Sequence, residues 1–125
     1  MTMPSHKVLV VDDSQVVRRQ VTLALNLAGY DVIEACDGVD GQAKFDNSVA
    51  MVILDVNMPR MNGLELLEVI KRDANNANVP VVMLTTEGHP QMIARAKSAG
   101  AKGWIIKPFK PELLVAAVTK LVAAK

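Results

Sequence analysis

Acidic side chains, a threonine and a lysine directly follow the apolar segments of this chain, where they could do chemistry together. Asp12 and Asp13 follow the first apolar run, and Asp55 follows the third. Thr85 and Lys107 follow the fourth and the fifth. Three carboxylates packed together repel one another and raise the pKa of at least one of them. Because a cation would relieve this repulsion, we predict a cation site if the fold brings these segments together.

The ligand types indicate which cation this would be. Carboxylate oxygens suit a hard cation, and a shallow site with few protein ligands and room for water and phosphate fits Mg²⁺ better than Ca²⁺. A zinc site needs clustered His and Cys ligands, and the sequence has no such cluster. His6 lies near the N-terminus and His89 precedes a predicted helix, so we expect both on the surface.

Each of these residues also has a purely structural interpretation. Asp12 and Asp13 could cap the helix that follows them, since negative charge is favourable at a helix N-terminus. Asp55 could form a turn, and Lys107 could be a solvent-exposed lysine before a proline turn. For a residue taken singly, the structural interpretation is the simpler one. It weakens because all of these residues fall at one end of the predicted fold.

The elements that would position these residues alternate along the chain. Five short apolar runs are rich in Val and Ile and do not alternate strictly with polar residues, as in strands buried on both faces of a parallel sheet. Amphipathic segments with helix start and stop signals separate the runs. The runs span residues 8–11, 32–35, 51–54, 79–84 and 104–106, and the helices are expected to begin near Ser14, Asp37 or Asp40, Leu64, Pro90 and Pro111.

This (βα)5 pattern predicts an α/β fold with one doubly wound, five-stranded parallel sheet of flavodoxin-like strand order 2-1-3-4-5. In such sheets, ligands bind outside the carboxyl ends of the strands. We expect residues 1–125 to form a single domain, because the length suits one. The fourth helix should be held weakly, since its inward face is mostly alanine (Ala94, Ala96 and Ala99, with Met92 and Ile93).

Composition narrows the class of protein. Half of the residues are hydrophobic and 22% are charged, which is typical of a globular protein in water. The single cysteine, Cys36, excludes an internal disulfide and favours a reducing compartment. The sequence predicts neither a signal peptide nor a membrane span, so we expect a cytoplasmic location.

The net charge of +1 conceals an asymmetry along the chain. Residues 1–94 contain seven Lys and Arg against twelve Asp and Glu, whereas in residues 95–125 Glu112 is the one acid. Such a basic end could attract an acidic protein surface or nucleic acid, or could be a solvated lysine-rich face. Its basic residues are Arg95, Lys97, Lys102, Lys107, Lys110, Lys120 and Lys125.

Four motifs follow one another in the chain: Val-Val-Asp12-Asp13-Ser, Leu-Asp55-Val-Asn-Met-Pro59-Arg-Met-Asn-Gly63, Leu-Thr85-Thr and Lys107-Pro108-Phe109. Together they resemble the response-regulator receiver family, in order and over nearly the whole chain. Within that family, the Asp-Val-Asn-Met-Pro stretch and the Thr-Thr-Glu after the fourth strand are most similar to the stand-alone chemotaxis type.

The resemblance implies a phosphorylation switch of a two-component system. Asp55 would accept a phosphoryl group from a histidine kinase, a role that suits a carboxylate nucleophile. Lys107 would place its ammonium against the phosphate. The ligands of Mg²⁺ would be Asp12, Asp13, Asp55 and the backbone carbonyl of Asn57.

Thr85 and Trp104 are the switch residues that the resemblance implies. Thr85 would hydrogen-bond the phosphate and so shift the loop 86–89 and the helix after it, a change in population between two arrangements. Trp104 stands where the family usually has a tyrosine or phenylalanine that turns inward. It is either that switch or a packed strand residue, and its larger indole leaves open whether the inward rotamer fits. The resemblance also suggests a cis peptide bond between Lys107 and Pro108.

A lone receiver would signal by binding another protein. The resemblance places that contact on the basic face of the fourth helix, fifth strand and fifth helix, with a flagellar motor switch as the expected chemotaxis partner. A phosphorelay carrier and a receiver that regulates another kinase stay open as alternatives. DNA binding is disfavoured, because nothing resembling a helix-turn-helix follows the last helix.

Other classes of protein share this architecture. Phosphatases of the haloacid-dehalogenase type also use an aspartate after a strand, but they need a second aspartate two residues later as a general acid. Asn57 occupies that position here and cannot donate the proton, so we expect a regulatory protein and not an enzyme, one that assists its own phosphorylation and dephosphorylates slowly. Asn57 and Glu87 are expected to influence that hydrolysis. A nucleotide- or flavin-binding module would need a glycine-rich loop after the first strand, where this chain has acids.

Overall fold

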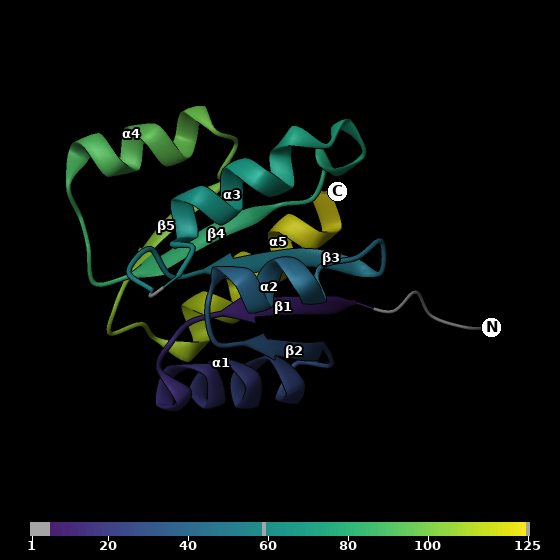
Figure 1. Ribbon diagram of the computed structural model, residues 1–125. Coiled ribbons are helices and arrows are strands. Elements are labelled where there is room, and N and C mark those ends of the chain that lie inside the picture. Colours follow the sequence, from purple (N-terminus) through teal and green to yellow (C-terminus); the bar gives the residue numbers. More distant parts are fainter. Residues whose placement is uncertain (1–5, 59, 125) are drawn as a thin grey trace.

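Five parallel strands form one sheet in the computed structural model, which describes residues 6–58 and 60–124 (Figure 1). Their order across the sheet is β2-β1-β3-β4-β5, so the predicted fold class and strand order are confirmed. All four strand pairs are parallel. The strands are β1 (Lys7–Val11), β2 (Asp31–Ala35), β3 (Val49–Leu54), β4 (Val81–Thr85) and β5 (Gly103–Ile106).

The helices that connect the strands are α1 (Gln15–Leu27), α2 (Gly38–Lys44), α3 (Gly63–Arg72), α4 (Pro90–Ser98) and α5 (Pro111–Ala124), with a short 3-10 helix at Ala74–Asn76. They cover both faces of the sheet (Figure 1). None of the helices in the described part of the chain is long and apolar enough to cross a bilayer.

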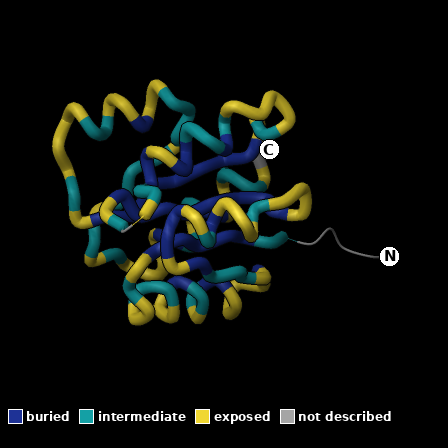
Figure 2. The backbone as a smooth tube through the Cα atoms, in the orientation of Figure 1, coloured by how far each residue is buried: buried dark blue, intermediate teal, exposed yellow. Residues whose placement is uncertain are grey.

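Side chains of each strand alternate between two apolar cores, one on each face of the sheet. In β1, Leu9 and Val11 belong to the core that contains residues of α3 and α4, whereas Val8 and Val10 belong to the core with α1 and α5. Every residue of β3 is buried, as the dark tube at the centre of Figure 2 shows. This explains why the strands read as continuous apolar runs.

Helix ends coincide with the signals in the sequence. The side chains of Ser14 and Asp37 accept backbone N–H bonds at the starts of α1 and α2, and Pro90 is the first residue of α4. Gly29 and Gly100 follow α1 and α4 with φ angles of 95° and 108°, a conformation that glycine adopts most readily.

Strand starts differ from the predicted runs by one or two residues, and two differences have a clear structural reason. Strand β4 begins at Val81 instead of residue 79, because Pro80 has no N–H to donate to the ladder. In α4, Ala94 is exposed, because it lies two positions from the buried Ala96 and therefore on another side of the helix. The weak packing of α4 is nonetheless evident, since Ala96 is the one residue that it buries, whereas α3 buries five.

Candidate metal centre

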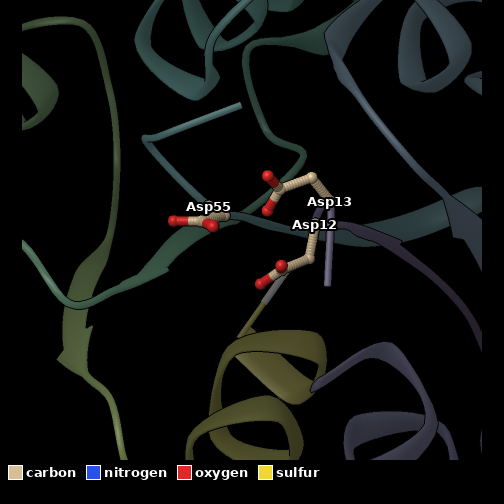
Figure 3. Close-up of side chains that lie close together, drawn as sticks. All are labelled: Asp12, Asp13 and Asp55. Atoms are coloured by element: carbon tan, nitrogen blue, oxygen red, sulfur yellow. The ribbon is translucent and has the colours of Figure 1, made fainter. Parts of the chain in front are cut away.

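Acidic side chains from two neighbouring strands meet at the carboxyl end of the sheet (Figure 3). Asp12 and Asp13 follow β1, and Asp55 follows β3, which pairs directly with β1. The Asp55 N–H donates to the carbonyl of Val11 at 2.9 Å. One carboxylate oxygen from each of the three acids lies within 4.8 Å of the others. The pairing of β1 with β3 therefore places three acids from distant parts of the sequence within reach of one cation.

The ammonium of Lys107 lies against two of these acids. Its Nζ is 2.7 Å from Asp12 Oδ2 and 3.2 Å from Asp55 Oδ2. Lys107 directly follows β5, and its N–H donates to the carbonyl of Thr85, the last residue of β4, at 2.8 Å. The peptide bond between Lys107 and Pro108 is cis, as the resemblance suggested. The lysine is therefore a counter-charge to the acids and not a solvent-exposed residue.

Burial and neighbouring charges shift two pKa values in this cluster. Burial raises the pKa of the Asp12 carboxyl above its ordinary value, and the charge of Asp55 adds to the effect; the hydrogen bonds from Lys107 and Ser14 oppose it without cancelling it. Burial alone would lower the pKa of Lys107. Its hydrogen bonds and charge interactions with Asp12 and Asp55 outweigh burial, so the pKa is raised and the lysine is cationic at neutral pH.

The loop after β3 turns back tightly against Asp55. The N–H of Gly63 donates to the carbonyl of Val56 at 3.1 Å, and a Cβ on Gly63 would collide with the carbonyl oxygen of Asp55. Glycine is therefore the residue that fits this close approach. Asn57 lies two residues beyond Asp55, and its N–H donates to Asp55 Oδ1 at 3.4 Å. Pro59 of the motif lies outside the described residues.

Thr85 is completely buried at the end of β4. Its Oγ1 accepts a hydrogen bond from the N–H of Glu87 at 3.1 Å. Because the hydroxyl is the acceptor in that bond, its own hydrogen can be donated to a further oxygen.

Glu87 connects three parts of the site. Its Oε1 accepts a hydrogen bond from Asn57 Nδ2 at 2.7 Å, and its carbonyl accepts one from Trp104 Nε1 at 2.8 Å. Trp104 is half-buried in β5 and also packs against the core beneath α3 and α4. The indole thus contacts the loop after β4 through a bond that no local sequence pattern could indicate.

The end of β2 does not join the cluster. Cys36 is exposed, and the neighbouring Asp37 forms an ion pair with Arg60 at 2.7 Å while capping α2. The hydrogen bond from the Asp40 N–H to Asp37 lowers the pKa of the Asp37 carboxyl, and Arg60 contributes in the same direction. Strand β2 lies at the sheet edge and neighbours β1 but not β3. Its carboxyl end therefore lies outside the β1–β3 pair that brings the acids together.

Sequence reasoning missed Arg18, which contacts the site from α1. Its Nη1 donates to the carbonyl of Asp12 at 2.7 Å, and its Nε donates to Glu34 of β2 at 3.2 Å. The position of Arg18 in the first turns of α1, close after the paired acids, was the one available signal. Its partner Glu34 is 16 residues away in sequence, so the contact depends on the packing of α1 against β2.

The all-oxygen donors fit a hard cation such as Mg²⁺. Three carboxylate oxygens that lie within 4.8 Å of one another carry more negative charge than the single ammonium of Lys107 offsets. This excess of negative charge favours binding of a divalent ion.

Comparison with known proteins assigns the class. The response regulator receiver domain family matches residues 8–119. The chain therefore belongs to the response-regulator receiver family, whose members are regulatory domains of two-component systems. Receiver domains bind Mg²⁺ at an acidic pocket, and the acids following β1 and β3 form such a pocket here.

Within this family, the chain is similar to chemotaxis proteins of the CheY type. It is 41% identical to chemotaxis protein CheY1 of Helicobacter pylori over 111 residues, which cover 86% of this chain and 90% of that protein. It is 40% identical to a CheY homolog of Campylobacter jejuni, again over 86% of this chain and 85% of the relative. The solved structure of CheY4 of Vibrio cholerae superposes with a TM-score of 0.86 at 39% identity, covering 94% of this chain and 98% of that one.

Proposed function

We propose that this chain is a phosphorylation-dependent signalling switch in which Asp55 accepts a phosphoryl group from a histidine kinase. The observation that carries the proposal is the cluster of three carboxylates within 4.8 Å, two of them in contact with the ammonium of Lys107. A carboxylate is a competent nucleophile toward phosphorus, but these acids would repel a phosphate unless positive charge is present.

The transfer forms a bond between an Asp55 carboxylate oxygen and phosphorus. It breaks the bond from phosphorus to the histidine nitrogen of the kinase, and the electron pair stays on the imidazole. Such a reaction depends mainly on positioning and on neutralising charge. Lys107 would supply a positive charge to the phosphoryl oxygens, and Mg²⁺, when bound, would supply the remainder. The residues that would hold the ion are Asp12, Asp13, Asp55 and, through its backbone carbonyl, Asn57.

The reporter of phosphorylation would be Thr85. Its buried hydroxyl can donate to a phosphoryl oxygen on Asp55, and this bond has no equivalent before phosphorylation. The same oxygen accepts from the N–H of Glu87, so a movement of Thr85 reaches the loop before α4. Because α4 buries only Ala96, that helix offers little resistance to displacement.

The kinase would approach over α1 and the loop after β5. An apolar hollow of about 620 Å³ lies there, and Lys107 and Thr86 form part of its wall. Leu23 and Leu27 of α1 line the same hollow and are 62% and 81% exposed. Two large apolar side chains exposed beside a hollow offer a candidate surface for another protein. Its continuity with Lys107 would let a docked helix present a phosphohistidine to Asp55.

The downstream partner would bind the face of α4, β5 and α5. Lys97, Lys102 and Trp104 line a second hollow of about 250 Å³ on that face. Fewer basic residues are available to a partner than the composition implies. Arg95 pairs with Glu68, and Lys107 belongs to the acidic cluster. The exposed lysines that remain favour an acidic protein partner, with charge affecting mainly the rate of association. They are Lys97, Lys102, Lys110 and Lys120, while Lys125 lies outside the described residues.

By its similarity to chemotaxis proteins we assign this partner to the flagellar motor switch, and the setting to the cytoplasm. The chain would be a phosphoacceptor and not a turnover enzyme. The Asn57 amide is too weak an acid to protonate a leaving group, and its Nδ2 donates to Glu87, so hydrolysis of the acyl phosphate would be slow.

Intact-mass measurement after incubation with acetyl phosphate and Mg²⁺ tests the proposal. We expect the mass of one added phosphoryl group on the wild-type chain, and none after chelation of the metal or in Asp55→Asn. Asp46→Asn, which changes an exposed acid outside the cluster in the same way, is the matched control and should be phosphorylated normally. Phosphate on Asp55→Asn, or none on the wild-type chain, would contradict the assignment.

A further inference from the structure

A side chain outside the acidic cluster holds the backbone of Asp12. Arg18 donates from Nη1 to the Asp12 carbonyl at 2.7 Å and from Nε to Glu34 Oε1 at 3.2 Å. Thr22, one turn further along α1, donates from Oγ1 to the other carboxylate oxygen of Glu34 at 2.9 Å. The guanidinium is therefore fixed at two points, and the carboxylate that anchors it is itself held by a second residue.

The group that Arg18 holds is the peptide unit between the two paired acids. That carbonyl belongs to the bond that joins Asp12 to Asp13, so its orientation governs where both side chains point. The other bonds to Asp12 lie outside this peptide unit: the Asp12 N–H donates to the carbonyl of Ala35 at 3.0 Å, Oδ1 accepts from the N–H of Ser14 at 2.8 Å, and Oδ2 accepts from Lys107 Nζ at 2.7 Å. Arg18 therefore holds the carbonyl of the Asp12–Asp13 peptide unit, a group that those bonds do not reach.

We infer that Arg18 is a positioning residue for the metal site: anchored by Glu34, it orients the Asp12–Asp13 peptide so that both carboxylates face the cation. The inference rests on the proposed function, since it concerns the same magnesium site. The Arg18 side chain is only 16% exposed, so water competes little for its bonds. Loss of such supporting contacts around a metal site commonly weakens binding by about 10- to 100-fold.

The sign of the effect separates positioning from simple electrostatics. A guanidinium near the acids repels a divalent cation, so if Arg18 acted only through its charge, its removal would strengthen Mg²⁺ binding. If Arg18 orients the ligands, its removal weakens binding in spite of the lost repulsion. The two roles therefore predict opposite changes in the same dissociation constant.

Calorimetric titration of the metal-free full chain with Mg²⁺ is the test. We expect Arg18→Met to raise the dissociation constant on the order of tenfold. Arg19→Met is the matched control, since it removes the same charge from the adjacent, exposed position of α1, and we expect less than about a twofold change. Arg18→Lys keeps the charge but not the two-point fork, so its constant should lie between wild type and Arg18→Met.

The kinetics of phosphorylation by acetyl phosphate give a second readout. In Arg18→Met, the Mg²⁺ concentration for half-maximal rate should rise by the same factor as the dissociation constant. The rate at saturating Mg²⁺ should change little, because Asp55 and Lys107 are untouched. A variant that was merely misfolded would lose the saturated rate instead.

Arg18→Met that folds, by circular dichroism, yet binds Mg²⁺ as tightly as wild type or more tightly would overturn the inference and leave the proposed function intact. A wild-type chain that binds no Mg²⁺ would overturn the proposed function itself. Should Arg18→Met not fold, Thr22→Val frees one oxygen of Glu34 without changing charge or shape. It should weaken binding about threefold, and an unchanged constant there would equally refute the role of Arg18.

Discussion

At the scale of single residues, the site is organised by a surplus of negative charge. Asp12 and Asp55 are almost completely buried, and Lys107 is the cation that contacts both. Lys107 cannot neutralise the whole cluster, because Asp13 adds a third carboxylate to the same place. The metal-free chain therefore depends on Lys107 for stability as well as for its proposed chemistry.

We predict that Lys107→Met lowers the free energy of unfolding of the metal-free chain by roughly 2 kcal/mol at neutral pH, because it leaves buried carboxylates without their partner. The deficit should shrink as the pH falls. A raised pKa means that folded Asp12 binds a proton more tightly than unfolded Asp12, so the cost of its burial is present above that pKa and disappears as the carboxyl protonates. Loss of Lys107 should raise the pKa of Asp12 further, which widens the pH range over which the deficit shrinks.

Urea unfolding in the presence of a chelator, at about pH 7 and about pH 5, measures both effects. Lys120→Met removes an exposed lysine of α5 and serves as the control for net charge. A deficit that is the same at both pH values would show that Asp12 is not the group left unpaired.

At the scale of elements, the loops after the strands are tied to one another by side chains from different elements. Asp37 begins α2 and pairs with Arg60 of the loop after β3, which has a positive φ of 55°. Glu87 of the loop after β4 is bonded to Asn57 and to Trp104. Movement of one loop is therefore coupled to its neighbours through specific hydrogen bonds.

We predict that Asp37→Ala lowers the free energy of unfolding, since it removes the cap of α2 and the partner of Arg60. Asp37→Asn, which still caps, should lose less. Because the pKa of Asp37 is lowered in the folded chain, its charge stabilises the fold above the ordinary value of 3.8 and ceases to do so as pH falls through the lowered pKa. Unfolding titrations should thus show the wild-type advantage over Asp37→Asn above pH 3.8 and a decline only below it.

Trp104→Phe should release the loop before α4, because phenylalanine fills much of the same space but cannot donate to the Glu87 carbonyl. Amide hydrogen exchange read by mass spectrometry should become several-fold faster in peptides that cover residues 86–93, and stay unchanged in β3. Equal exchange in the two proteins would mean that the indole hydrogen bond does not restrain the loop.

At the scale of the whole molecule, the carboxyl end of the sheet holds the candidate site, whereas its two faces hold the apolar cores. The carboxyl ends carry the acids and Lys107, while the apolar cores on either face keep the strands in register. The hollow against α1 lies beside the cluster, and the basic hollow at α4 and β5 lies on a separate surface. If the phosphoryl donor and the downstream partner use these two surfaces, as proposed, mutations can distinguish them.

We predict that Leu23→Glu together with Leu27→Glu slows phosphoryl transfer from a histidine kinase that phosphorylates the wild-type chain by at least about tenfold. The rate with acetyl phosphate should not change, since a small donor needs no docking surface. Val39→Glu adds a charge at an exposed apolar position of α2 and should affect neither donor. Equal slowing with both donors would place the defect in the cluster instead of in docking.

The alternating pattern of the chain was sufficient to predict the architecture. Strands buried on both faces must be almost wholly apolar, and glycine and proline mark where helices begin or end. Local sequence is therefore sufficient to identify these elements. Asp12, Asp13, Asp55, Thr85 and Lys107 could be placed at one end of the sheet because each lies at or just after the end of an apolar run. The topological rule for parallel sheets then located the candidate site.

Only the tertiary structure decided which side chains touch. Whether Lys107 faces solvent or the acids, whether Trp104 reaches Glu87, and that Arg18 bridges Glu34 to Asp12 all depend on packing between segments far apart in sequence. The end of β2 shows the same limit, since Asp37 occupies an equivalent position in its strand yet pairs with Arg60. Local patterns determine what each segment becomes, but hydrogen bonds and ion pairs form between whatever groups the packed elements bring within about 3 Å.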